Sequence, residues 1–149
     1  MSFSREVFPN LIKNDKLKGA LSGSLSHAYI IEGTKGSGRL TAARNAAAAV
    51  LCECRDDRYS DLPCGECSVC SRIFRGIHPD VIEVDTGDKK TIGVDTVRMI
   101  RSQVFVAPSE SERKFFIIRG NKFICVSDTI TCITGNNSVT TVGHHAVIN

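Results

Sequence analysis

The pattern of apolar and polar positions divides most of the chain into short strands that alternate with helices. Three apolar runs read as buried strands: "HAYIIEG" at 27–33, "PDVIEVD" at 79–85 and "RKFFIIRG" at 113–120. They are rich in β-branched or aromatic residues and are bounded by glycine or polar residues, as buried strands are. Because strands alternate with helices, the pattern predicts an α/β fold with a mainly parallel sheet.

Four segments have the composition or spacing of helices. Residues 39–53, "RLTAARNAAAAVLCE", are the clearest because alanine and leucine dominate them. In the last helical segment, 94–106, one face holds apolar side chains, and Asp95 lies in its first turn, where a negative charge suits the helix dipole. That face consists of Val94, Val97, Ile100, Val104 and Phe105. Residues 10–22 predict a short amphipathic helix, and another short helix follows a cysteine run at 64–70.

The pattern changes after Gly120. The last 29 residues contain two charged side chains, Lys122 and Asp128, and show no helical period. A frameshift near the codon for Arg119 or Gly120, followed by an early stop, would produce this change, and such a truncated product should be poorly soluble. The alternative is a divergent C-terminal element with two β-rich segments, 122–126 and 138–148. We therefore divide the chain into 1–119 and an atypical tail, 120–149.

Composition restricts the class of protein. A chain of 149 residues can bury one core, and a net charge of +3 is too small to indicate nucleic-acid binding by itself. The N-terminus has no signal-peptide pattern, and no apolar run approaches the roughly 18 residues of a membrane span. We therefore expect a cytoplasmic protein with no membrane partner. In a reducing compartment, seven cysteines indicate metal binding or catalysis rather than disulfides.

The run "PCGECSVC" places Cys64, Cys67 and Cys70 in a C-x-x-C-x-x-C array. Adjacent pairs at this spacing can hold one metal, and a fourth thiolate completes the tetrahedron of structural zinc. Cys52, at the end of the alanine-rich helix, is our choice for the fourth ligand, with Cys54 as the alternate. A four-thiolate site leaves no open position for water, so the predicted zinc is structural; an iron–sulfur cluster or unligated thiols are the alternatives.

The stretch "GTKGSGRL" between the first strand and the alanine-rich helix has the glycines of a phosphate-binding loop, Gly33, Gly36 and Gly38. A hydrolysing loop needs lysine and then serine or threonine, but Arg39 and Leu40 stand in those positions. Thr41 is one position later, about 100° around a helix, so we expect it to point away. The order of elements predicts phosphate-loop architecture without magnesium-dependent hydrolysis, and leaves open nucleotide binding through backbone amides and Arg39.

These motifs follow one another along the chain in the same order as in the bacterial clamp-loader subunits of DNA polymerase III, which the sequence therefore resembles. The residues that carry the resemblance are "LSHAYIIEG", "GTKGSGR", "VLC", "PCGECSVC", "HPDVIEVD" and "IGVDTVRMIRSQVFVAPSESERKFFII", and it covers about residues 10–118. It implies a partial AAA+ module: a P-loop-type parallel sheet flanked by helices, with a zinc knuckle inserted within 52–72. The gamma/tau ATPase and the delta-prime subunit share this layout.

Arg39 and Leu40 make the chain look like a delta-prime subunit, which commonly lacks the loop lysine and threonine. The run Phe115–Ile118 is followed by Arg119 and Gly120 where the resemblance would place aspartate and glutamate in an active ATPase. Those carboxylates hold magnesium and polarise the attacking water. The resemblance therefore implies a non-hydrolysing arm of the clamp loader.

The partners implied by this resemblance are the gamma/tau and delta subunits, and through them the sliding clamp and primed DNA. An active gamma/tau-type ATPase is the second hypothesis, and a small zinc-binding nucleic-acid module is the third. The serine-arginine-cysteine motif of delta-prime, its lid and its collar domain have no counterpart in this sequence.

Overall fold

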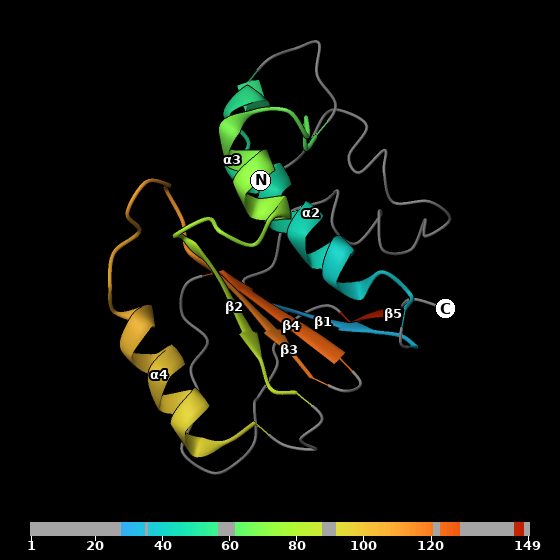
Figure 1. Ribbon diagram of the computed structural model, residues 1–149, viewed down its shortest axis with the longest axis vertical. Coiled ribbons are helices and arrows are strands. Elements are labelled where there is room, and N and C mark those ends of the chain that lie inside the picture. Colours follow the sequence, from blue (N-terminus) through green and yellow to red (C-terminus); the bar gives the residue numbers. More distant parts are fainter. Residues whose placement is uncertain are drawn as a thin grey trace.

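A computed structural model describes residues 28–34, 36–56, 62–87, 92–120, 123–128 and 145–147 (Figure 1). The described elements are β1 (Ala28–Glu32), α2 (Arg39–Leu51), a 3-10 helix η1 (Glu53–Asp56), α3 (Ser68–Phe74), β2 (Val81–Asp85), α4 (Val94–Val104), β3 (Phe115–Arg119), β4 (Phe123–Asp128) and β5 (His145–Val147). The expected α/β class and the three strands read from the sequence are confirmed. The helix predicted over 10–22 lies outside the described residues.

The strands form one sheet in the order β2-β3-β4-β1-β5. The β2–β3 and β1–β5 pairs are parallel, whereas β4 is antiparallel to both of its neighbours. The expectation of a mainly parallel sheet is therefore only partly met. The connection from β3 to β4 consists of residues 120–122, and a parallel neighbour needs a crossover of a dozen or more residues. A connection this short permits only the antiparallel direction.

The two β-rich segments noted in the tail contribute β4 and β5. They lie on either side of β1, so the strand before the glycine loop has a paired neighbour on both sides (Figure 1).

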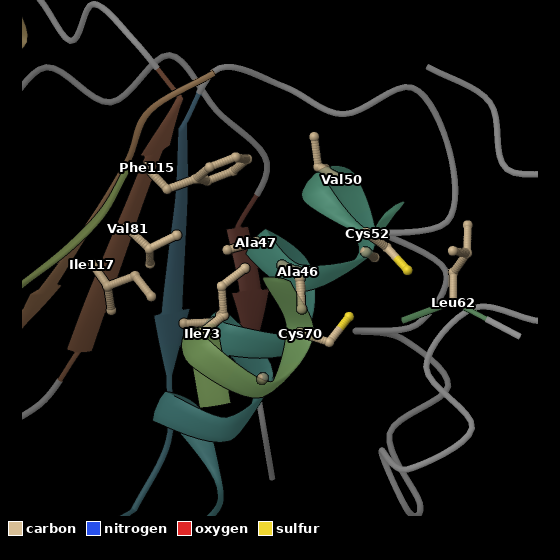
Figure 2. Close-up of a cluster of buried hydrophobic side chains, with 14 of the residues drawn as sticks. Ala46, Ala47, Val50, Cys52, Leu62, Cys70, Ile73, Val81, Phe115 and Ile117 are labelled. Carbon is tan, nitrogen blue, oxygen red and sulfur yellow. The ribbon is translucent and has the colours of Figure 1, made fainter. Parts of the chain in front are cut away.

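One face of the sheet is covered by α2 and α3. The largest apolar cluster lies there, and it combines the alanine side chains of α2 with Ile73 of α3 and with Val81, Phe115 and Ile117 of the sheet (Figure 2). Alanine side chains let a helix approach its neighbours closely, and most of α2 is buried as a result. The buried part of α2, from Ala42 to Val50, thereby positions the helix against the sheet.

The other face packs against α4, whose Ile100 contacts Val84 and Phe116. The apolar face of α4 that packs against the sheet is shorter than the face predicted from the sequence. Val94 is exposed, and Phe105 lies beyond the last helical residue with 81% of its surface accessible. Among the described residues, no helix combines the length and apolar character needed to cross a bilayer.

Candidate functional site

Four of the predicted ligands meet at the end of α2 and the start of α3. The Sγ atoms of Cys52, Cys64, Cys67 and Cys70 all lie within 4.8 Å of one another. Cys52 and Cys70 are buried, and Figure 2 shows their sulfur atoms beside Leu62, at the edge of the apolar cluster. The described structure therefore brings together the four cysteines chosen from the sequence.

The spacing of the sulfur atoms fits a tetrahedral metal. A Zn–S distance of about 2.3 Å places the ligands of one ion about 3.8 Å apart, and the Cys64 and Cys70 sulfurs are 4.0 Å apart. The local backbone positions these thiols before any ion binds. The Cys67 N–H donates to Cys64 Sγ and the Cys70 N–H donates to Cys67 Sγ, each over 3.4 Å. Such a site can hold one soft or borderline metal ion with closed coordination.

The thiols differ in their acidity. Burial raises the pKa of Cys52 and of Cys70. Burial also acts to raise the pKa of Cys64, but hydrogen bonds from the Cys67 and Glu66 backbone outweigh it and lower that pKa to about 6. Cys64 is thus a thiolate at neutral pH, and a metal that binds the cluster must displace protons from Cys52 and Cys70.

The alternate ligand, Cys54, does not join the cluster. Cys54 is not among the cysteines whose sulfurs lie within ligand distance of one another. A hydrogen bond to Cys64 raises its pKa to about 12, which keeps the thiol protonated. His78 is buried, and its Nδ1 accepts a hydrogen bond from the Asp80 N–H at 3.2 Å. His78 therefore organises the turn before β2.

The glycine loop connects β1 to α2 with two residues in the left-handed region. Gly36 has φ 87° and Gly38 has φ 81°, conformations that side chains rarely adopt. The Ser37 N–H donates to Thr34 O at 3.1 Å and closes the turn. Gly38 is the N-cap of α2 and provides no side-chain hydrogen bond to the helix. The loop thus has the tight backbone that the glycine spacing predicted.

A cavity of about 430 Å³ lies over this loop. Its lining comprises Gly36, Gly38, Arg39, Leu40, Thr41, Asp85, Arg119 and Gly120. Four of the five predicted loop residues therefore lie at one cavity, and Gly33 is not part of its lining. The structure also brings Arg119 and Gly120 from the end of β3 to the same place. Thr41 was expected to point away, but it is exposed and belongs to the lining.

The acidic group of this cavity is already paired. Asp85 Oδ2 lies 2.9 Å from Arg119 Nη2, and Asp85 Oδ1 accepts the Gly87 N–H at 2.8 Å. Sequence reasoning had not placed Asp85 at this site, although its position at the carboxyl end of a strand parallel to β3 was the available signal. Since its carboxylate is engaged on both oxygens, the described lining offers no free carboxylate to a metal ion.

Two sets of partly buried polar contacts connect these regions to the rest of the fold, and the sequence did not reveal them. The Asp80 carboxylate accepts three backbone N–H bonds, from Ser109, Glu110 and Ser111, at 2.6 to 2.8 Å. Glu110 in turn pairs with Arg72 of α3 at 2.6 Å. These contacts fix the loop before β3 against the helix that carries Cys70.

The second contact joins α2 to β2. Arg44 binds both carboxylate oxygens of Glu83 at 2.6 and 2.9 Å, and its remaining nitrogen donates to Phe74 O at 3.0 Å. It therefore links the helix of the glycine loop, the end of α3 and the sheet.

Comparison with known proteins finds one matching family and several relatives. The profile of the family described as "DNA polymerase III, delta subunit" matches residues 10–125. The tau subunit of DNA polymerase III from Bacillus subtilis is 36% identical over 121 residues, which are 78% of this chain and 21% of that protein. The gamma subunit from Buchnera aphidicola (subsp. Schizaphis graminum) is 32% identical over 117 residues, 78% of this chain and 31% of that protein. The Escherichia coli tau subunit is 30% identical over 118 residues, 76% of this chain and 18% of that protein.

The chain spans between about a fifth and a third of the length of these relatives. The relatives are named as tau and gamma subunits, so the similarity does not select the delta-prime type over the gamma/tau type.

Proposed function

We propose that this chain, which belongs to the DNA polymerase III delta subunit family because the family profile matches residues 10–125, serves as a non-hydrolysing, delta-prime-like arm of the clamp loader. In this role it assembles in the cytoplasm with gamma/tau and delta subunits. Those partners use ATP to place the sliding clamp on primed DNA. In this proposal the chain contributes a rigid surface to the assembly and does not hydrolyse ATP itself.

The lining of the glycine-loop cavity is the observation that supports this proposal. Arg39 and Leu40 occupy the positions at which lysine would contact the outer phosphates and a hydroxyl would bind magnesium. On the opposite side, Arg119 and Gly120 replace the carboxylates that hold the metal and polarise water. Hydrolysis needs both sets of groups, and neither is present.

We propose that the cysteine cluster holds a structural zinc ion. Cys52, Cys64, Cys67 and Cys70 would be its ligands, and a bound ion would fix the end of α2 to the start of α3. Closed coordination gives this ion no role in catalysis. The knuckle then acts as a rigid part of the surface offered to other subunits.

A gamma/tau-type ATPase is the second candidate function, and the names of the relatives favour it. It requires the chain to hydrolyse ATP despite Leu40 and Arg119. The two candidates therefore differ in turnover and agree in assembly.

The test of the proposed function is reconstitution. The purified chain is mixed with gamma/tau and delta subunits from the same organism and analysed by size-exclusion chromatography, with clamp loading on primed DNA as the second readout. Co-elution together with clamp loading that depends on this chain supports the proposal. A chain that neither co-elutes nor changes loading contradicts it. The Asp95→Asn variant, altered at a side chain that is 98% exposed on α4, is a matched control that should behave as the original chain.

We further propose that residues 1–119 form the partial AAA+ module and that residues 120–149, although they contribute β4 and β5 to the sheet, are an atypical tail that does not continue its sequence. Sequencing the encoding DNA across the codons for 118–149 and beyond tests this division. A second reading frame that encodes a continued clamp-loader sequence identifies the tail as a frameshift product. Its absence identifies the tail as a divergent element whose strands β4 and β5 belong to the native sheet.

A further inference from the structure

We propose that Cys54 and Cys64 form an oxidation-sensitive pair, which a hydroperoxide converts to a disulfide so that the cysteine site loses its metal ion. Because the pair adds a fifth cysteine to the zinc site proposed above, this inference rests on that site. Its consequence for the molecule is that an oxidant can remove the ion that fixes the end of α2 to the start of α3.

Cys54 lies beside the four-cysteine cluster without being one of its ligands. It packs against the main apolar cluster together with Cys64 and Cys67, and its thiol is hydrogen-bonded to Cys64. The four sulfurs that lie within ligand distance of one another do not include it. Four thiolates complete the coordination of a tetrahedral ion. A fifth thiol in contact with one of them therefore has no part in closed coordination and is available for another reaction.

The 3-10 helix η1 holds Cys54 in this position. The Arg55 N–H donates to Cys52 O at 3.2 Å, and Arg55 Nη1 donates to Val50 O at 3.2 Å. Both contacts tie the residue next to Cys54 back to the end of α2. Local backbone structure therefore keeps Cys54 beside Cys64, although residues 55–63 separate the two in the sequence.

Differences in exposure direct an oxidant to this pair. Cys52 is 4% exposed and Cys70 is 0% exposed. The other three thiols, those of Cys54, Cys64 and Cys67, belong to partly exposed residues. A small oxidant from solvent therefore reaches Cys64 or Cys67 before it reaches the two buried ligands. Of these two accessible ligands, Cys64 is the one to which the Cys54 thiol is hydrogen-bonded.

The reaction consumes one hydroperoxide for each disulfide. The Cys64 thiolate attacks one oxygen of hydrogen peroxide, the O–O bond breaks, and the products are a sulfenic acid on Cys64 and a hydroxide ion. The Cys54 thiol then attacks the oxidised sulfur, the S–O bond breaks, and the sulfenic oxygen leaves as water with the proton of the thiol. The two sulfurs together lose two electrons, and the peroxide gains them.

Cys54 has an advantage over the other thiols in the second step. Cys52, Cys67 and Cys70 bind the ion in the loaded site, so each must leave it before attacking the oxidised sulfur. Cys54 needs no such step. The disulfide with Cys64 removes one of four ligands, and the opened site is then accessible to water and to competing chelators. Disulfides in a reducing compartment are usually transient and often sense oxidants.

Disulfide mapping of the full, zinc-loaded chain tests the inference. The chain is treated with hydrogen peroxide, the remaining thiols are alkylated, and the protein is digested with trypsin and a glutamyl endopeptidase before mass spectrometry. The digestion separates the relevant cysteines, with Cys52 in fragment 45–53, Cys54 in 54–55, Cys64 in 59–66, and Cys67 and Cys70 together in 67–72. We expect the first disulfide to join fragment 54–55 to fragment 59–66.

Zinc release is the second readout, followed with a chromophoric chelator while peroxide is added. We expect release from Cys54→Ser to be slower than from the original chain by about fivefold or more, because the thiol that completes the disulfide is missing. Cys132→Ser is the matched control, since Cys132 has no neighbouring cysteine at metal-ligand spacing, and it should release zinc as the original chain does. A dithiol reductant together with added zinc should restore the metal content.

A first disulfide that excludes Cys54 overturns the inference, as does equal zinc release from Cys54→Ser and the original chain. The disulfide map of the original chain decides the question even if Cys54→Ser does not fold. Zinc content before peroxide is added separates the two proposals. A chain that holds no zinc contradicts the zinc site and the pair with it, whereas a chain that holds zinc and forms another disulfide contradicts the pair alone. Neither result affects the reconstitution assay.

Discussion

The cysteine cluster and the glycine-loop cavity lie at opposite ends of the same helix, α2, and they differ in how completely their chemistry is present. At the C-terminal end, Cys52 meets three further thiols at the distances one metal ion requires. At the N-terminal end, the loop keeps the left-handed glycines, whereas Arg39 and Leu40 stand where a hydrolysing loop has its reactive groups. The C-terminal end of α2 combines a suitable geometry with four ligands, whereas the N-terminal end has the loop geometry without the lysine and hydroxyl.

This difference shows that backbone architecture and chemistry are separable. The glycine loop is needed to connect β1 to α2 in a short turn, so its glycines have a structural reason to persist without nucleotide hydrolysis. Cys67 caps α3 through its sulfur, but a cap needs only one acceptor. The meeting of four thiols at ligand distance is explained by a metal ion.

The largest expected effect is loss of the cysteine site. Structural zinc sites contribute on the order of 10 kcal/mol, which is comparable to the total stability of a small domain. We expect Cys70→Ser to abolish metal retention and cooperative thermal unfolding, whereas Cys54→Ser should retain one metal ion per chain. Elemental analysis and circular dichroism melting measure both. A Cys54→Ser variant that lost its metal would show that Cys54 is the fourth ligand.

Acidity should affect the same site, because burial raises the pKa of Cys52 and Cys70. Metal binding displaces their protons, so the affinity should rise with pH and fall as the solution is acidified. Competition with a chromophoric chelator across a pH series measures this. An affinity that does not change with pH would contradict ligation by these two thiols.

The next effect concerns Asp80, whose contacts stabilise the loop that pairs with α3. Burial acts to raise the pKa of Asp80, but three backbone N–H bonds outweigh it and lower that pKa below its ordinary value. The carboxylate therefore adds stability that is present above the unfolded pKa of about 3.9 and is lost as the pH falls through the lower folded value. We expect Asp80→Asn to cost about 3 kcal/mol at pH 7 in urea unfolding, and less in acid. Asp95→Asn, at a fully solvated carboxylate, should change stability by less than about 0.5 kcal/mol.

A smaller effect should follow from removing Arg44, which links α2 to the end of α3 and to β2. Arg44→Ala breaks a partly buried bidentate pair with Glu83 and a bond to Phe74 O. We expect a loss of about 2 kcal/mol in unfolding free energy, with metal retention unchanged. Arg98→Ala removes a pair that is exposed on both sides and should cost less than about 0.5 kcal/mol. Loss of the metal in Arg44→Ala would show that the cysteine site depends on this link.

The smallest effect should come from restoring the loop residues alone. The double variant Arg39→Lys with Leu40→Thr should not gain magnesium-dependent ATP turnover, because Arg119 and Gly120 still provide no carboxylate for the metal. Phosphate release above that of the original chain would show that the loop is the only defect.

Local pattern was sufficient to predict the elements that depend on short stretches of sequence. The strand before the glycine loop, the alanine-rich helix and the spacing of Cys64, Cys67 and Cys70 are each specified by residues close together in the chain. The choice of Cys52 over Cys54 was also favoured by position, because Cys52 directly follows the last turn of α2.

Long-range pairing was not predictable in the same way. The antiparallel direction of β4 depends on the short connection after β3 and on its pairing with β1. Neither feature can be read from the periodicity of the sequence. The contacts of Asp80 with residues 109–111 and of Arg44 with Glu83 join positions about 30 to 40 residues apart. Polar residues of this kind look like surface residues in the sequence, and only the packed structure identifies their partners.

The measurement that tests the central claim most directly is magnesium-dependent ATP turnover by the purified, metal-loaded chain, compared with its Arg39→Ala variant. If the glycine loop is a retained framework without hydrolytic chemistry, phosphate release will be equal in the two proteins and equal to the buffer background. Turnover by the original chain that disappears in Arg39→Ala would contradict the account and identify the chain as an active ATPase of the clamp loader.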